Sequence, residues 1–359
     1  MDSGDQLLLD GSCLVFVLFD VAEEINLERP AGREPKFRHP VPDYVRFEHP
    51  PVVESAPEIQ LSSGERFKVR VKYFQYGVIS LELQLAFSSL TWDRLVSQAH
   101  SLVEQVEIES AATAIVRERV QQAGAALVKP YTKWLTEEYL VIQISGTKDR
   151  ALSSAELLTQ YGDRVSQLVR GDRLPLSEGE KKEVLSSSVS YYPSDVLVVS
   201  WTAALVYDAA EPAVPTLQLL EYANSQLLEF RHYDEVLTGL LAELYKVLER
   251  GGGLLRRWRM AREAARLNTI RLDVMELAER SEHAIRFLSD MYYARVYRLA
   301  AEKIGVTDYR NSVGDKLRIA NELYQFIVNE FHHSRAFVLE LMVVLILIID
   351  LIYLFRGKT

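Results

Sequence analysis

AFVLELMVVLILIIDLIYLF, residues 336–355, is the stretch of sequence that decides the expected fold of this chain. A helix of this length spans about 30 Å, which matches the hydrocarbon core of a bilayer. Its central run, Leu341–Ile349, contains no polar residue and leaves no polar face for a helix at the surface of a globular protein. The stretch therefore predicts one C-terminal transmembrane helix, a tail anchor over residues 336–355.

Two acids, Glu340 and Asp350, interrupt this stretch on either side of its midpoint. Each costs less than the about 2.5–3.5 kcal/mol of a central position, so the apolar residues, worth about 5–8 kcal/mol together, outweigh both. We expect both acids either to make helix–helix contacts within the membrane or to reach toward the nearer interface. The alternative is a long core helix or a coiled-coil strand whose acids face solvent.

The remainder of the chain carries the features of a protein exposed to a reducing compartment. Its first residues, Met1–Asp5, are acidic where a signal peptide is basic, and the apolar run Leu14–Phe19 has the length of a buried strand. The single cysteine, Cys13, excludes an intramolecular disulfide. We therefore expect the bulk of the chain to lie in the cytoplasm.

Length and charge limit the class of protein. The 359 residues leave room for two domains, and 48% hydrophobic with 25% charged residues is ordinary for globular material. A net charge of −9 argues against a protein whose whole surface binds nucleic acid, although it leaves a local basic patch open.

Residues 1–215 predict an α+β head domain. Lys68–Tyr76 and Val78–Leu85 form a hairpin about Gly77 in this prediction. The second strand alternates, so we expect one set of its side chains to point inward and the other outward. The inward set is Ile79, Leu81, Leu83 and Leu85, and the outward set is Ser80, Glu82 and Gln84.

Further signals complete the head domain. Strands are expected at Tyr139–Ile144 and Val196–Tyr207, and two helices begin with the capping boxes Ser153-x-x-Glu156 and Ser177-x-x-Glu180. A proline-rich stretch at about residues 28–60 predicts a loop without regular structure.

Residues 216–335 predict a helical stalk. No proline follows Pro215, and apolar residues recur every three or four positions. Three long helices are expected at about 216–248, 254–303 and 308–335, separated by Gly251–Gly253 and by Gly305–Thr307. The expected fold is thus an α+β head, a hairpin or coiled-coil-like bundle of long helices, and one transmembrane helix.

Three motifs add a family resemblance. They are Ser190–Asp195 leading into Trp201–Asp208, Glu221–Asp234, and Tyr293–Tyr297 followed by Lys316-Leu317 and the apolar tail with its two acids. Together they resemble bacterial members of the "required for meiotic nuclear division" family, a family of unknown molecular function, over about residues 65–355. The resemblance implies a self-associating, single-pass protein of the bacterial inner (cytoplasmic) membrane. A mitochondrial member of that family supports translation in the organelle, and no catalytic residues are established for the family.

The sequence contains no constellation typical of an enzyme. His332 and His333 are adjacent, which points them about 100° apart on a helix and not onto one face as metal ligands require. There is no phosphate-binding loop and no nucleophile elbow, and Cys13 has no base near it in sequence. We therefore expect no catalysis, no metal and no cofactor.

Two polar sets remain as candidate sites. Asn224, Arg231 and Asp234 share one broad helix face, where they either line a pocket or form a hydrogen-bond network to the α+β domain. Separately, seven arginines and one acid lie between Arg250 and Arg271. Four of these arginines fall within an arc of about 120° and form either a solvated face or a stripe that binds anionic lipid or RNA phosphate. The stripe is Arg256, Arg259, Arg262 and Arg266.

The sequence thus predicts a non-enzymatic, tail-anchored membrane scaffold that self-associates into a homo-oligomer and presents its α+β domain to a protein partner. The alternative is a membrane tether for ribosomes or RNA through the arginine stripe. A membrane-associated enzyme of unknown reaction is the third hypothesis.

Overall fold

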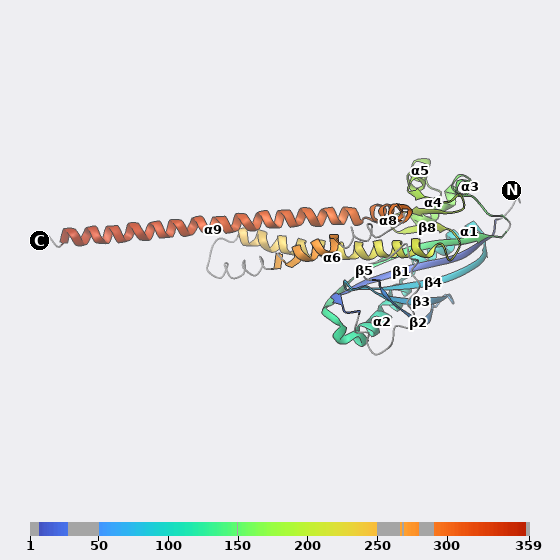
Figure 1. Ribbon diagram of the computed structural model, residues 1–359, viewed down its shortest axis with the longest axis horizontal. Helices are drawn as coiled ribbons and strands as arrows, with labels where there is room; N and C mark the ends of the chain where they lie inside the picture. Colours follow the sequence, from blue (N-terminus) through green and yellow to red (C-terminus); the bar gives the residue numbers. More distant parts are fainter. Residues whose placement is uncertain are drawn as a thin grey trace. The chain divides into compact units, whose positions relative to one another are not determined.

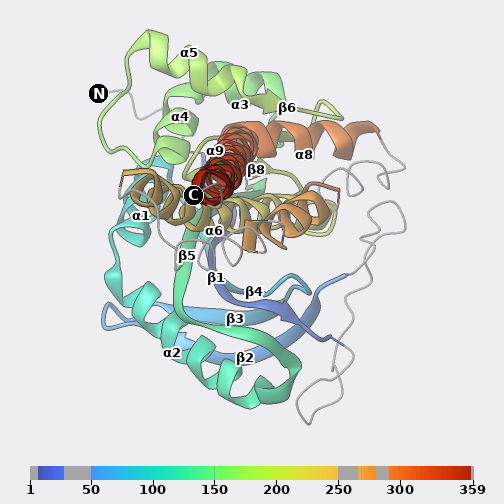
Figure 2. The same ribbon diagram turned by 90° about the vertical axis from the view of Figure 1, so that its left-hand side faces the viewer.

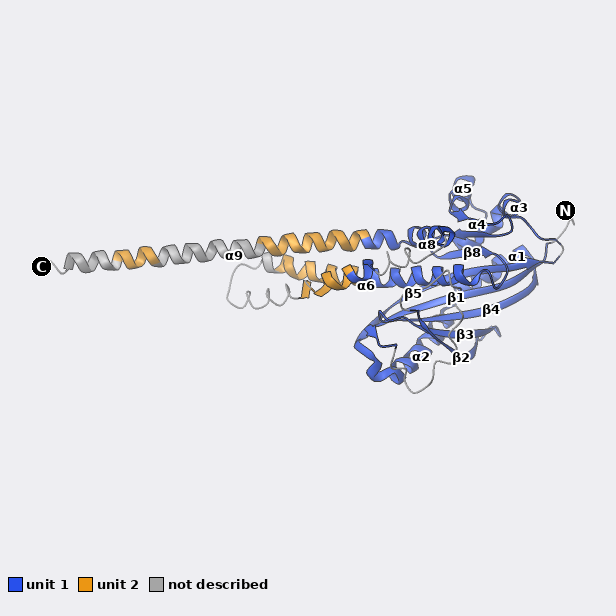
Figure 3. Cartoon of the chain, viewed as in Figure 1, with its two compact units in different colours: residues 1–232, 276–310 blue, residues 233–275, 311–359 orange. Residues whose placement is uncertain are grey.

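The computed structural model describes residues 7–27, 50–148, 150–249, 266–267, 269–279 and 291–356 (Figure 1). The chain divides into two compact units (Figure 3). Unit 1 comprises Met1–His232 with Glu276–Arg310, and unit 2 comprises Tyr233–Met275 with Asn311–Thr359. The chain passes between the units at three places. Two of them lie within the long helices α6 (Val214–Glu249) and α9 (Val306–Arg356), and the third lies between Met275 and Glu276.

Unit 1 is built on a mixed sheet whose described strands follow the order β2-β3-β4-β1-β5-β8-β7-β6. All neighbours are antiparallel except β5 and β8, which are parallel. The chain is therefore of the mixed α+β class. The strands are β1 (Leu9–Ile25), β2 (Val52–Gln60), β3 (Arg66–Tyr73), β4 (Val78–Leu90), β5 (Leu127–Thr147), β6 (Ser188–Val189), β7 (Val196–Val199) and β8 (Ala203–Tyr207).

The hairpin predicted about Gly77 is confirmed. β3 and β4 pair antiparallel, and Gly77 has a φ of +93°, a conformation that side chains disfavour. A Cβ at this position would also lie 1.8 Å from the backbone oxygen of Ala22, so only glycine fits the turn against β1.

Helices cover both faces of the sheet. One face buries the apolar residues of β1 and β4 against α1 (Trp92–Val103), α2 (Val106–Ala123) and α4 (Gly162–Arg170). The other face lies under the first part of α6, which contacts β3 and β4. The remaining helices of this unit are α3 (Ser154–Gln160), α5 (Glu178–Ser186) and α8 (Met291–Ile304), with a 3-10 turn, η1 (Gly124–Ala126).

This second layer corrects one prediction about β4. The inward set of β4 is buried as expected, but Ser80 and Glu82 of the supposed outward set are buried as well. They point into the interface with α6, so the alternation in β4 separates an apolar interior face from a polar interior face.

β5 is the longest of the described strands and bends along its pairing with β1 (Figure 2). Asp20 of β1 pairs with Leu135 and Ala22 pairs with Pro130, so β5 carries extra residues opposite Val21. Such a bulge increases the twist and re-aims side chains. It brings Tyr131 of β5 against His232 of α6, with ring centroids 4.7 Å apart.

The proline-rich stretch is partly a strand. Residues 52–60 form β2 at the edge of the sheet, where the register shifts between Ala56 and Ile59 around Pro57. Proline has no N–H for the ladder and is tolerated at an edge or a bulge, which explains why the prediction of a loop is wrong here. Residues 28–49 lie outside the described residues.

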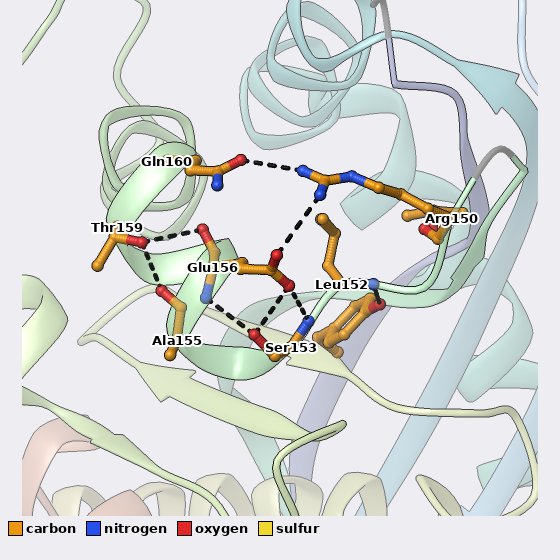
Figure 4. Close-up of polar contacts among 9 residues, drawn as sticks. Arg150, Leu152, Ser153, Ala155, Glu156, Thr159 and Gln160 are labelled. Atoms are coloured by element: carbon orange, nitrogen blue, oxygen red, sulfur yellow. Dashed lines mark hydrogen bonds and ion pairs between the residues drawn. The ribbon is translucent and has the colours of Figure 1, made fainter.

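The first predicted capping box is confirmed at the start of α3 (Figure 4). Glu156 donates its backbone N–H to Ser153 Oγ at 3.2 Å, and Ser153 donates its own to the Glu156 carboxylate at 2.9 Å. The second box forms only in part. Ser177 accepts from the backbone of Glu180, but the Glu180 carboxylate pairs with Arg170.

Unit 2 packs helices through regularly spaced apolar residues. Asp234 of α6 accepts hydrogen bonds from Ser312 Oγ at 2.8 Å and from Lys316 Nζ at 2.6 Å, which places α6 and α9 side by side here. The buried residues recur at intervals of three and four in α6 and in helical residues 266–274, and of seven in α9, as in a coiled coil. They are Leu237, Leu240 and Leu244, then Leu267, Ile270 and Val274, and finally Val313 and Ala320.

The helical breaks are located as follows. The structure places a break at Gly305, between α8 and α9, as the sequence predicts. Residues 254–265, 268 and 280–290 of the second predicted helix lie outside the described residues, as does the predicted break at Gly251–Gly253.

The predicted tail anchor is wrong. Among the residues that the structure describes, no helix combines the length and the apolar character needed to cross a membrane. α9 is instead one continuous helix of 51 residues, and only nine residues separate Glu340 from Asp350. Nine helical residues span about 14 Å, less than half of a hydrocarbon core. The predictions of a transmembrane helix and of a single-pass inner-membrane localisation are therefore also wrong.

Candidate functional site

A cluster of charged and polar side chains lies between the sheet of unit 1 and α6. We call this set of five side chains the polar clamp: Arg70, Lys72, Ser80, Glu82 and Glu221. The register of β3 and β4 pairs Arg70 with Glu82 and Lys72 with Ser80, so all four share one face of the sheet. α6 places Glu221 on the same face from 141 residues beyond Ser80.

The clamp is a closed network of opposite charges. Lys72 Nζ lies 2.9 Å from the Glu82 carboxylate and also binds the Glu221 carboxylate. Ser80 Oγ donates to the second oxygen of Glu221 at 2.6 Å, and Arg70 pairs with Glu82. Two positive and two negative side chains therefore compensate one another within a largely buried interface.

Burial and pairing act against each other on these groups. Burial alone would lower the pKa of Lys72, but attraction by Glu221 and Glu82 raises it overall. Burial acts to raise the pKa of Glu82, yet Lys72 and Arg70 lower it. For Glu221 burial prevails, and its pKa is raised despite Lys72. Lys72 and Glu82 are therefore the charged centre of the clamp.

A second group of polar contacts fixes α6 farther along its length. His232 Nδ1 lies 2.7 Å from the buried Asp20 carboxylate of β1, and Arg231 pairs with Glu137 of β5. Ser225 Oγ lies 2.6 Å from the hydroxyl of Tyr76. Residues 221, 225 and 232 lie on one face of a helix, which explains why this side of α6 meets the sheet.

This arrangement holds α6 against the sheet through paired charges. Its charges are paired with one another beneath α6, and no group of three metal-binding side chains occurs in the described ranges. Buried ion pairs specify one arrangement of packed elements because any shift leaves a charge unpaired. We interpret the polar clamp as the set of contacts that fixes the position of α6 on the sheet.

The candidate residues Asn224, Arg231 and Asp234 take separate partners. Asn224 is buried and donates to the carbonyl of Leu220 in its own helix at 2.8 Å. Arg231 binds Glu137 within unit 1, and Asp234 binds Ser312 and Lys316 within unit 2. The structure does not bring the three together into one network.

The other candidate residues are only partly described. Arg266 is exposed, whereas Arg256, Arg259 and Arg262 lie outside the described residues. The phosphate-binding stripe, and the ribosome or RNA tether that depends on it, therefore stay predictions. For Glu340 and Asp350 the structure describes the backbone of α9 alone, and their expected contacts within a membrane fall with the tail anchor.

α9 carries an exposed apolar surface within residues 336–355, the stretch predicted to be a transmembrane helix. Six consecutive large apolar residues, Val343–Ile348, are each between 50% and 61% exposed. Single exposed apolar side chains are common, but a contiguous run of them marks an interaction surface.

Comparison with known proteins places the chain in a family through residues 10–213. The profile of the family described as "Uncharacterized protein MJ0711, N-terminal domain" matches residues 10–213, more than half of the chain. The chain belongs to this family. The match covers the strands of the sheet with α1 to α5 and ends just before α6.

One relative within this family comes from an archaeon. The uncharacterized protein MJ0711 of Methanocaldococcus jannaschii is 18% identical over 188 residues, which cover 52% of this chain and 58% of the relative. The alignment thus spans less than two thirds of that protein. No solved structure matches the chain.

These comparisons correct the expected family. The resemblance to bacterial members of the "required for meiotic nuclear division" family is wrong, because a different family profile matches and the relative is archaeal. Two of the three motifs, Glu221–Asp234 and Tyr293–Tyr297, lie outside the matched residues. Much of these two runs is buried and belongs to the packed interior of this chain.

Proposed function

We propose that this chain is a non-enzymatic assembly protein that self-associates through α9 and presents unit 1 to a partner. The observation that carries the proposal is the exposed apolar run Val343–Ile348 on a helix of 51 residues. Burial of such a run stabilises an assembly by about 25 cal/mol for each Å² of apolar surface removed from water.

A seven-residue repeat runs the length of α9 and identifies the surface that assembles. Positions spaced alternately by three and four residues form a continuous stripe, which we call the α9 seam. All its members are apolar or aromatic except Ser334. They are Val313, Leu317, Ala320, Tyr324, Ile327, Phe331, Ser334, Val338, Leu341, Leu345, Ile348, Ile352 and Phe355.

The first residues of the α9 seam pack inside unit 2, whereas later residues of the seam are exposed. Val313 and Ala320 are buried in unit 2, where α6 supplies matching apolar residues. α6 ends at Glu249, whereas the seam continues, and Leu345 and Ile348 are 57% and 50% exposed. The same repeat in a second copy supplies the matching surface for the continued seam.

The two acids of the tail agree with this assembly. Glu340 and Asp350 fall outside the seam, at the outer c and f positions of the repeat. Charged side chains at these positions remain in water when helices pack through a and d positions. This is the coiled-coil alternative for the tail, with its acids facing solvent.

Unit 1 offers a rigid aromatic surface to which a partner protein can bind. Tyr191 and Tyr192 are 52% and 62% exposed and pack edge to face with centroids 4.6 Å apart. Asp195 holds their loop by accepting both of their backbone N–H groups at 2.8 Å. Exposed aromatic residues in a fixed conformation are typical of protein interfaces, because little entropy is lost on binding.

Sedimentation equilibrium of the full chain tests the proposal. We expect a molar mass that rises with concentration toward a multiple of the 41.0 kDa chain. A constant mass of one chain across the concentration range, or a single chain recovered in detergent micelles, contradicts self-association.

A further inference from the structure

The positions that flank the α9 seam carry information about the orientation of the assembled helices. In the seven-residue repeat these flanks are the e and g positions, whose charges set partner choice and orientation. Beyond the part of α9 that packs in unit 2, three flanking positions are charged. They are Glu330 at a g position and Arg335 and Arg356 at e positions.

A parallel assembly places opposite charges together. In parallel helices in register, a g position faces the e position five residues later in the second helix. Position 330 of one copy therefore faces position 335 of the next, and the sequence has Glu at the first and Arg at the second. The next two pairs of this kind, between positions 337 and 342 and between 344 and 349, are apolar, and the last pairs Leu351 with Arg356.

An antiparallel assembly removes this match. There e positions face e positions and g positions face g positions, so Glu330 meets apolar flanks. Arg335 meets either an apolar residue or Arg356, which is a repulsive pair. Charge complementarity therefore favours the parallel arrangement.

We infer that the α9 helices of several copies assemble in parallel and in register, with Glu330 and Arg335 specifying the orientation. The inference rests on the proposed self-association and names its geometry. Because every copy carries unit 1, the assembly gathers several copies of unit 1. Gathered copies bind a repetitive partner far more tightly than single copies do.

Disulfide trapping in the full chain tests the orientation. Ser334 and Ile348 both occupy d positions, which lie opposite their own equivalents only in a parallel, in-register assembly. Cys13 is fully buried and gives no background reaction. We expect both S334C and I348C to form linked pairs on oxidation, and V343C, at an outer position, to remain unlinked.

The outcomes separate the inference from the function it rests on. An antiparallel assembly can bring only one of the two positions opposite itself, so linkage at one site or neither in an associating chain overturns the inference. The proposed self-association then still stands. A chain that does not associate at all overturns both.

A charge exchange tests the role of the flanking pair. E330R places arginine against arginine and is expected to weaken association about fivefold, whereas E330R with R335E restores it. Failure of the double exchange to restore association overturns the assignment of Glu330 and Arg335.

Discussion

Lys72 Nζ on β3 lies 2.9 Å from the carboxylate of Glu82 on β4, with only 10% and 4% of the two side chains exposed. α6 completes this pair with Glu221, so the helix docks onto the sheet through charges as well as apolar surface. An apolar interface tolerates small displacements, whereas a buried charge network leaves a charge unpaired when it shifts. The polar clamp therefore gives α6 a single position in unit 1.

Breaking the clamp should be costly. Glu221→Gln leaves the buried ammonium of Lys72 with Glu82 as its one carboxylate, and loss of a hydrogen bond to a buried charged group costs about 1.5–3 kcal/mol. Urea unfolding followed by circular dichroism measures this difference. Glu235→Gln, an exposed change on the same helix, is the control and should stay within about 0.5 kcal/mol. Equal unfolding midpoints for the two variants would show that the clamp does not hold α6.

Asp20 should make stability depend on pH. Burial raises the pKa of the Asp20 carboxyl, and His232 offsets the shift only in part. An acid with a raised pKa stabilises the fold below its unfolded value, about 3.9, and this contribution is lost as pH rises through the raised pKa. Asp20→Asn removes the dependence, so its stability relative to the native chain should rise with pH above about 4.

Urea unfolding across this pH window measures the difference between Asp20→Asn and the native chain. The slope should approach at most about 1.4 kcal/mol per pH unit. A flat difference for Asp20→Asn contradicts the account of the Asp20–His232 pair.

Gly305 should be intolerant of a side chain. Its φ is +98°, and a Cβ would lie 2.8 Å from the ring of Trp201. Gly305→Ala should therefore destabilise the fold by about 1–2 kcal/mol from the backbone alone, with the ring contact adding to this. Gly314→Ala, in the open interior of α9, should instead stabilise it by about 0.5–1 kcal/mol. Thermal unfolding of both variants measures the contrast, and equal shifts would contradict it.

The strand β4 follows from its local sequence pattern, but the second layer that covers the sheet does not. Ile79, Leu81 and Leu83 alternate with polar residues, and this alternation correctly locates β4 and its apolar face. It also assigns Glu82 to solvent, because alternation is the usual mark of a strand with one wet face. The residue that buries Glu82 with its neighbours is Glu221, which lies far along the chain, so only the tertiary structure shows the pairing.

In the tail, the apolar composition leads to a different prediction from the spacing of the apolar residues. The apolar content of residues 336–355 favours a membrane helix, in which each of the two acids would add a free-energy cost of insertion. The seven-residue repeat becomes evident only when the tail is followed back to Val313 and Ala320, whose burial in unit 2 fixes its register. In that register Glu340 and Asp350 lie at outer positions and carry no penalty.

The measurement that tests the central claim most directly compares two double variants of α9 by sedimentation equilibrium. Leu345→Asn with Ile348→Asn changes the seam, and Val343→Asn with Leu347→Asn removes similar apolar surface at outer positions. Self-association through the seam predicts that the first pair sediments as a 41.0 kDa single chain while the second retains the assembled mass. Equal effects of the two pairs, or assembly that survives the first, would contradict it.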